Sequence, residues 1–393
     1  MISRYFGLLE VWTQVSLALV RFFSAFSFVC VSLSSIVLVD AGSISSTWLD
    51  NNVNENWFTP ANWSAGVPNN GGGNTFTASI DSQVRVTSPV TIDNLNFLPG
   101  ARLYVQNTAM TVLADSVFGT GGTPPRIQVQ GFENPSSLSL GNVAQFEEGV
   151  VDNATLIAES SNGSATIGWN NASIQKVGPN AFIQLIGAGA ALLNTSDSSN
   201  PLASLSENRG TVIIANGGSL TLPSLRNLGN GETGGSFGVD NGTTLDIIGD
   251  VESTGAFGAS ASTVRIGGSL FGGGSFGLGG TTQGTVEIGG SLIVKSLSIA
   301  GISSLAVDGN TELTGRATLV GENARMDIGG DYLSKSYQSG GTIYGSPSKL
   351  SKVPQPACEE IFSMRDISVF SRPMTRPIFC CLLNTLPSSS MEI

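Results

Sequence analysis

Apolar and polar residues alternate in short runs along most of this chain. The clearest form is a seven-residue motif with apolar residues at positions one and three and glycine at position five. Its five copies begin at Leu245, Val264, Val286, Leu305 and Met326. Because side chains alternate between the two faces of a strand, positions one and three point inward and position two points outward. The motif therefore predicts short strands that each bury one face.

The copies follow one another at steps of 19, 22, 19 and 21 residues. A recurring period of this kind is the signature of stacked coils. We expect the glycine at position five to adopt a positive φ angle and to turn the chain at a corner of the coil. Position seven, apolar or aromatic in every copy except at Thr311, then re-enters the core. Weaker copies occur upstream, so we predict an all-β fold, a parallel β-helix with coils of about 20 residues.

Two terminal segments lack this pattern. Residues 1–41 are predicted to be a signal peptide, because Phe22 to Val39 carry no charge and Ala41 ends a short sequence suited to cleavage. An uncleaved membrane anchor is the alternative, since an apolar run of about 18 residues reaches the lower limit for a span. Residues 346–393 mix Pro, Cys, Met, Arg and Phe without periodicity. We interpret them as a disordered appendix or the translation of a shifted reading frame.

Three tryptophans precede the repeats. Trp48, Trp57 and Trp63 lie in a W…NW…NW…G-x-P segment that ends at Pro68. The segment resembles the opening of bacterial secreted β-strand-repeat proteins, which include autotransporter-associated repeat proteins and exported proteins with PEP-type sorting signals. The resemblance covers about residues 46–115. It implies export, a right-handed, pectin-lyase-like solenoid, and an adhesin-like role at the cell surface or in the extracellular matrix.

The tryptophans themselves allow two interpretations. Trp48, Trp57 and Trp63 could stack on sugar rings of a glycan, or they could cover the open first coil, whose strand edge would otherwise be unpaired. We favour a cap, because all three lie before the repeats begin. The predicted domains are therefore a cap at residues 42–80 and a solenoid at residues 81–345.

Composition narrows the chemistry that the chain can perform. Its 393 residues include 18 Lys and Arg, 29 Asp and Glu and no histidine, for a formal charge of −11. An acidic surface repels phosphate backbones, so binding to nucleic acid is disfavoured. Without histidine, the commonest general base and metal ligand is missing. The four cysteines lie outside the predicted solenoid. We expect no cofactor and no metal site, and membrane contact only through the N-terminal export segment.

Two kinds of catalytic pattern occur in the repeats. Ser236 and Ser275 lie in G-x-S-x-G sequences, but a serine nucleophile of this type needs a histidine base. Gly272, Gly274 and Gly277 match the dinucleotide fingerprint, which requires a βαβ unit rather than this β-rich context. Both matches are expected by composition in a chain with 50 glycines. We predict no catalytic residues.

A polysaccharide lyase is the alternative function. Lyases on this type of fold hold Ca²⁺ on carboxylates and use Arg or Lys as the base, and a row of charged residues occupies position two of the repeats. The row consists of Asp246, Arg265, Glu287 and Asp327, with Ala306 between the last two. The same row would also serve as a solvated outer face, which we favour.

An enzyme would need a cleft built by longer loops, and residues 114–182 and 190–210 are the candidate stretches. The hypothesis that we prefer is a secreted or cell-surface structural or adhesive protein without catalytic activity. Its expected partners are surface glycans or matrix components, and a glycan-binding module is a further alternative. A long repeat surface suits weak, multivalent contact.

Overall fold

A computed structural model describes residues 42–49, 55–70, 74–229, 235–279, 283–320, 323–339 and 342–345. The predicted signal peptide with its cleavage position at Ala41 and the C-terminal segment 346–393 lie outside the described residues. The chain divides into two compact units. In the smaller one, Met1–Ser43 with Gly71–Thr75, the Thr75 amide donates to the Gly42 carbonyl. The larger one, Ile44–Asn70 with Phe76–Ile393, holds the features described below except Ser43 and Thr75, the first residues of β1 and β2.

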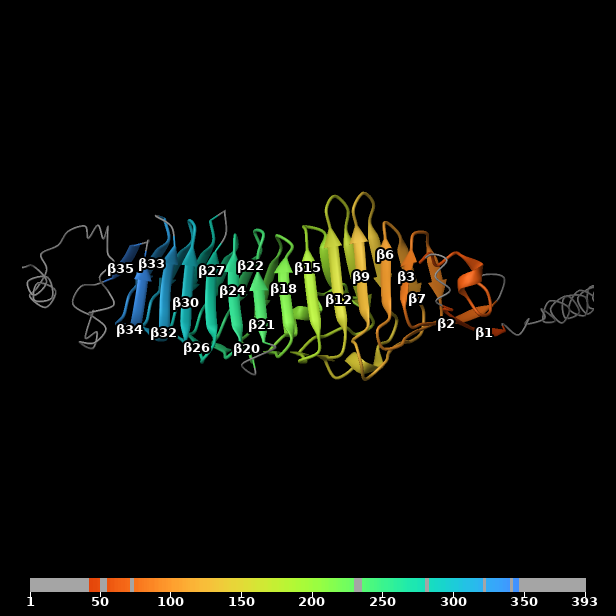
Figure 1. The fold of residues 1–393 in the computed structure, drawn as a ribbon, viewed down its shortest axis with the longest axis horizontal. Coiled ribbons are helices and arrows are strands. Elements are labelled where there is room, and N and C mark those ends of the chain that lie inside the picture. The colour runs from red at the N-terminus through yellow and green to blue at the C-terminus, as the bar shows by residue number, and fades with distance from the viewer. Residues whose placement is uncertain are drawn as a thin grey trace, which may run out of the picture. The chain divides into compact units, whose positions relative to one another are not determined.

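Three strands form each coil of the larger unit, and the pairing pattern proves the stack. Along most of the unit a strand pairs in parallel with the strand three places further along the chain, for example β21 with β24 and β24 with β27. A strand and its partner three places on are separated by one complete turn of the coil. Successive coils therefore lie side by side, as Figure 1 shows. This arrangement is a parallel β-helix, as the sequence predicts.

The coils present three faces, called face 1, face 2 and face 3, and within each coil the chain passes from face 1 to face 3 and then to face 2. Face 1 comprises β3 (Gln83–Val86), β6 (Arg102–Gln106), β9 (Arg126–Gly131), β12 (Thr155–Ser160), β15 (Phe182–Ile186), β18 (Thr211–Ala215), β21 (Ser236–Val239), β24 (Ala256–Ser260), β27 (Ser275–Gly279) and β30 (Ser296–Ala300). Face 2 comprises β11 (Val150–Val151), β14 (Lys176–Val177), β17 (Glu207–Asn208), β20 (Leu225–Asn227), β23 (Val251–Ser253), β26 (Leu270–Phe271) and β29 (Leu292–Val294). The long strands β32 (Thr311–Val320) and β34 (Tyr332–Ser339) join both faces into one 19-stranded sheet.

Face 3 consists of two sheets in succession. The first comprises β4 (Val90–Ile92), β7 (Ala109–Val112), β10 (Ser136–Ser139), β13 (Ala165–Trp169) and β16 (Ala190–Asn194). The second comprises β19 (Ser219–Leu222), β22 (Thr244–Ile247), β25 (Thr263–Ile266), β28 (Thr285–Ile288), β31 (Ser304–Val307), β33 (Arg325–Ile328) and β35 (Thr342–Gly345). A four-stranded sheet stands before face 2, made of β1 (Ser43–Thr47), β2 (Thr75–Ile80), β5 (Asn94–Phe97) and β8 (Ser116–Phe118). The short 3-10 turns are η1 (Pro60–Asn62), η2 (Ala144–Phe146) and η3 (Pro201–Ser204).

The five sequence repeats stack in register on face 3. Leu245 lies beside Val264, which lies beside Val286, and the series continues through Leu305 to Met326. All five side chains are fully buried. Each strand thus places the same repeat position on the same side of the sheet, which is what the alternation predicts. The repeat alignment is confirmed.

Coil length varies along the stack. Partners on face 1 are 29 positions apart between Ile127 and Leu156, and again between Ile183 and Val212. They are only 19 positions apart between Phe257 and Phe276. The longer coils occupy the centre of the unit, where the extra residues form turns and the elements η2 and η3. A period near twenty residues therefore holds for the second half, and the central coils are longer.

The repeat glycines do not adopt the conformation expected of them. Gly268, Gly290 and Gly309 are absent from the residues with positive φ. Their amides instead form a continuous ladder, in which Gly290 N–H donates to the Gly268 carbonyl at 2.8 Å and Gly309 N–H to the Gly290 carbonyl at 2.9 Å. A Cβ atom on Gly290 would lie 2.8 Å from the Gly268 backbone. The prediction of a positive φ was wrong: glycine is required because adjacent coils approach too closely for any side chain.

Apolar stacks fill the interior and one polar ladder runs beside them. The rings of Phe237, Phe257 and Phe276 are spaced 5.8 Å apart from coil to coil. Asn208 and Asn227 are fully buried, and the Asn208 amide donates to the Asn227 side-chain oxygen at 2.8 Å. Because each buried amide is hydrogen-bonded, the ladder fixes the register of face 2 without an unpaired polar group.

Candidate functional site

The three N-terminal tryptophans form one buried cluster. The Trp48 and Trp63 rings meet edge to face at 5.1 Å, and Trp57 meets Trp63 at 4.7 Å. Trp57 is fully buried and the other two expose 4% of their surface. The Trp57 indole N–H donates to the Pro68 carbonyl and that of Trp63 to the Trp57 carbonyl. Stacking on a sugar needs an exposed ring face, so this burial favours the cap over a glycan platform.

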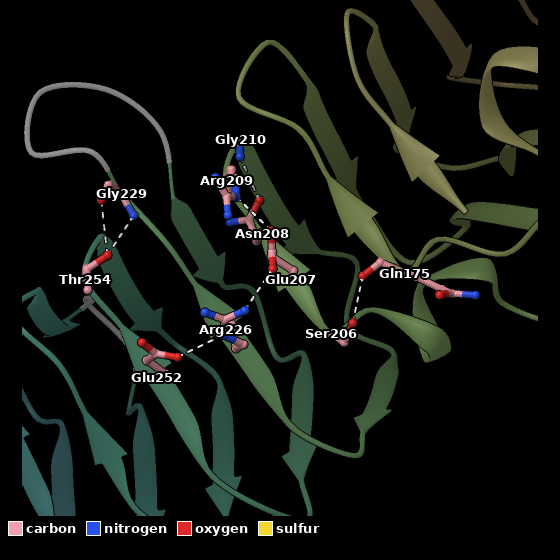
Figure 2. Close-up of polar contacts among 10 residues, drawn as sticks. All are labelled: Gln175, Ser206, Glu207, Asn208, Arg209, Gly210, Arg226, Gly229, Glu252 and Thr254. Atoms are coloured by element: carbon pink, nitrogen blue, oxygen red, sulfur yellow. Dashed lines mark hydrogen bonds and ion pairs between the residues drawn. The ribbon is translucent and has the colours of Figure 1, made fainter. Parts of the chain in front are cut away.

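Charged side chains on face 2 form a ladder along the stack, drawn in Figure 2. Glu207, Arg226 and Glu252 occupy equivalent positions on β17, β20 and β23. The Arg226 guanidinium donates to Glu252 at 2.9 Å and to Glu207 at 3.1 Å, and Arg209 donates to Glu207 at 2.7 Å. The hydrogen bond to Glu252 and the negative charge of that carboxylate raise the pKa of Arg226 above its ordinary value. These charges bind one another from coil to coil.

A second charged ladder lies on face 3, where the sequence indicates a possible lyase row. Arg265 stands between Asp246 and Glu287 and forms ion pairs with both at 3.3 Å. Asp327 is separated from this trio by Ala306 and pairs instead with Arg325 on its own strand. The structure thus brings three of the four predicted residues together and leaves the fourth apart.

In the described parts of the chain, no three His, Cys, Asp or Glu side chains gather as metal ligands would.

A hollow of about 410 Å³ lies on the outer side of face 1. Its floor is a column of glycines, Gly238, Gly258 and Gly277, which lie side by side on β21, β24 and β27. In the same column, Ile213 bounds the glycines on one side and Ser298 on the other. Three coils without side chains at this position leave the space open.

Small hydroxyl residues flank that floor. Ser236 and Ser275 both line the hollow, together with Ser296, whose hydroxyl donates to that of Ser275 at 3.0 Å. From the sequence, Ser236 and Ser275 stand out only because they lie in a G-x-S-x-G pattern that lacks its histidine base. The sequence does contain a signal for the hollow. Ser-Phe-Gly and Ala-Phe-Gly recur at the spacing of one coil, which places small residues in register on adjacent strands.

The central stretches that were candidates for catalytic loops contain regular strands. Residues 114–182 include β8 to β14 and residues 190–210 include β16 and β17, and longer turns link these strands. Their outer polar groups also bind along the stack, as when Asn170 donates to Asn142 at 3.0 Å and Asn142 to Asp115 at 3.2 Å. The hollow lies further on, over β21 to β32.

Comparison with known proteins found no matching family model, no matching curated protein and no matching solved structure. Among the residues that the structure describes, no helix has the length and apolar character needed to cross a membrane.

Proposed function

We propose that this chain is a secreted or cell-surface β-helix with a structural or adhesive role and without catalytic activity. The observation that carries the proposal is the pairing of outer polar groups along the stack. On face 2, Arg226 is engaged by two carboxylates, and on face 3 Arg265 is engaged in the same way. Such ladders hold the outer surface in one arrangement, which suits a scaffold that presents repeated contacts.

The same pairing argues against the lyase alternative. An arginine that acts as a base must face the substrate and give up its interactions with neighbouring carboxylates. Arg265 is the arginine of the predicted row, and its guanidinium lies between Asp246 and Glu287. A calcium-dependent lyase would also need those carboxylates for the metal. The row supports a solvated, self-paired face better than it supports a catalytic site.

The resemblance of the tryptophan-rich segment supplies the expected location. Secreted β-strand-repeat proteins are exported and act at the cell surface or in the matrix, and the buried cluster of Trp48, Trp57 and Trp63 serves here as a cap on the first coil. We infer that surface glycans and matrix components are the partners. A surface of repeated weak sites gains strength when many copies act together.

An adhesion assay tests this role. The full chain is coupled densely to beads, and bead retention is measured on surfaces coated with acidic and neutral polysaccharides or matrix proteins. We expect retention on at least one surface together with weak binding of the soluble monomer to that surface, because avidity multiplies weak contacts. Failure of the beads to attach to any surface would contradict an adhesive role.

A further inference from the structure

Two arginines stand side by side on the outer side of face 1. Arg102 on β6 and Arg126 on β9 are direct partners in the parallel register. Like charges directly opposite each other on a sheet repel, and elsewhere on this molecule the ladders alternate in sign. Within the described residues, neither arginine has an Asp or Glu oxygen within ion-pair distance. The pair therefore concentrates positive charge on a chain whose net charge is −11.

A hydrogen-bond chain fixes the orientation of one of these guanidinium groups. Arg126 donates from Nη2 to the Gln128 side-chain oxygen at 2.7 Å. Gln128 in turn donates to Glu159 at 3.0 Å, and Gln130 donates to the same carboxylate oxygen at 3.0 Å. Gln128 exposes only 8% of its surface, so it holds the guanidinium from a fixed position. The Nε atom of Arg126 is buried and has no hydrogen-bond partner in the described structure.

The surrounding charges leave this patch positive. Arg85, on the neighbouring strand β3, binds Glu55 at 3.3 Å and lies 5.9 Å from the centre of the Tyr104 ring. Glu159 keeps its negative charge, but its carboxylate accepts hydrogen bonds from the amides of Gln128 and Gln130 and does not pair directly with either arginine. Arg102 and Arg126 together therefore carry one more positive charge than Glu159 offsets, and their planar donor groups match the oxygens of carboxylate and sulfate.

We propose that Arg102 and Arg126 form a binding site for the oxyanion groups, sulfate or carboxylate, of an acidic polysaccharide. Adjacent strands are about 4.8 Å apart, so the two guanidinium groups can engage one oxyanion or two neighbouring groups on a chain. Gln128 is a positioning residue for Arg126. This inference rests on the proposed adhesive function and names the chemistry of one of its contacts.

Direct binding to defined polymers tests the site. The full chain is titrated with a sulfated dextran, with a polyuronate and with unmodified dextran, and binding is followed by biolayer interferometry at low and high salt. The variant is Arg102→Gln, an exposed position whose loss should leave the fold intact. The matched control is Arg265→Gln, which removes the same charge from face 3. Arg126→Lys keeps the charge and removes the planar fork.

We expect the wild-type chain to bind one or both acidic polymers and not unmodified dextran, with weaker binding at high salt. Arg102→Gln should lower the affinity about tenfold, as loss of a charge-assisted contact predicts. Arg126→Lys should lower it by a smaller factor, and Arg265→Gln should leave it within about twofold, since it lies outside the proposed site. The preferred polymer identifies sulfate or carboxylate as the group recognised.

Equal losses in Arg102→Gln and Arg265→Gln would show that only net charge matters and would overturn the site. Absence of binding to either acidic polymer would also overturn it. In both cases the bead assay remains a separate measure of adhesion, because attachment to a neutral glycan or a matrix protein would support the proposed function without this site. Thermal unfolding of each variant verifies that any loss of binding occurs in folded protein.

Discussion

Gly268, Gly290 and Gly309 show how closely the coils approach one another on face 3. The sequence reveals that glycine recurs at this position but does not reveal why. A positive φ and a close backbone contact both select glycine, and only the neighbouring coil distinguishes them. The contact is with a residue about twenty positions away in sequence. The local pattern therefore could not show that close packing, and not a positive φ, is the reason for glycine at this position.

Substitution of Gly290 by alanine tests this close approach. The added Cβ would lie 2.8 Å from the Gly268 backbone, and relief of that overlap must separate two coils. We expect the free energy of unfolding to fall by about 1–3 kcal/mol, the usual cost of overpacking. Urea denaturation followed by circular dichroism measures the change.

Gly277→Ala is the matched control for this measurement. Like Gly290 it has no positive φ, but it lies within strand β27, where a Cβ would meet no atom within 4 Å. Alanine at this position should leave stability unchanged or raise it by about 0.4–1 kcal/mol, because it restricts the unfolded chain. Equal destabilisation by both substitutions would contradict the assigned role of the repeat glycine.

The strands are the elements that sequence pattern predicted best. Alternation and period together predicted which residues of β22, β25, β28, β31 and β33 are buried, because the same two-residue rule applies in every coil. The hollow on face 1 was missed, since its floor is defined by residues without side chains. The repeats predicted the row of charged residues on face 3. The ladder of Glu207, Arg226 and Glu252 on face 2 has no fixed motif in the sequence, and only the strand register reveals it.

Reversal of the charge at Arg226 tests the ladder of face 2. Arg226→Glu would place three carboxylates in register, and like charges in this position repel. We expect a lower melting temperature than wild type at low salt. The difference should shrink at about 1 M salt, where the Debye length is about 3 Å.

Lys295→Glu provides the control for that experiment. Lys295 is exposed, and the described residues give it no ion pair, so the substitution makes the same change in net charge outside a ladder. Its melting temperature should stay close to that of wild type. Equal shifts in both variants would show that the ladder adds nothing beyond the total charge.

At the scale of the molecule, the sequence predicted a parallel β-helix from five well-matched repeats, and the three-strand coils of the larger unit confirm it. The longer central coils could not be predicted, because a turn can lengthen without altering the strand pattern on either side. The right-handed sense, the signal peptide and the domain boundaries stay predictions. The sequence restricts the possible functions to a structural or adhesive role and a polysaccharide lyase, and the fold alone does not choose between them because a solenoid supports both adhesion and catalysis.

We propose that this β-helix binds acidic polysaccharides and does not cleave them. The most direct test of this proposal is to incubate the full chain, with and without calcium, with the acidic polysaccharides that it binds and to measure unsaturated sugar products over time. We expect bound polymer of unchanged length and no unsaturated product. Product formation that is lost in Arg265→Gln would contradict the proposal and would establish the charged row of face 3 as a lyase site.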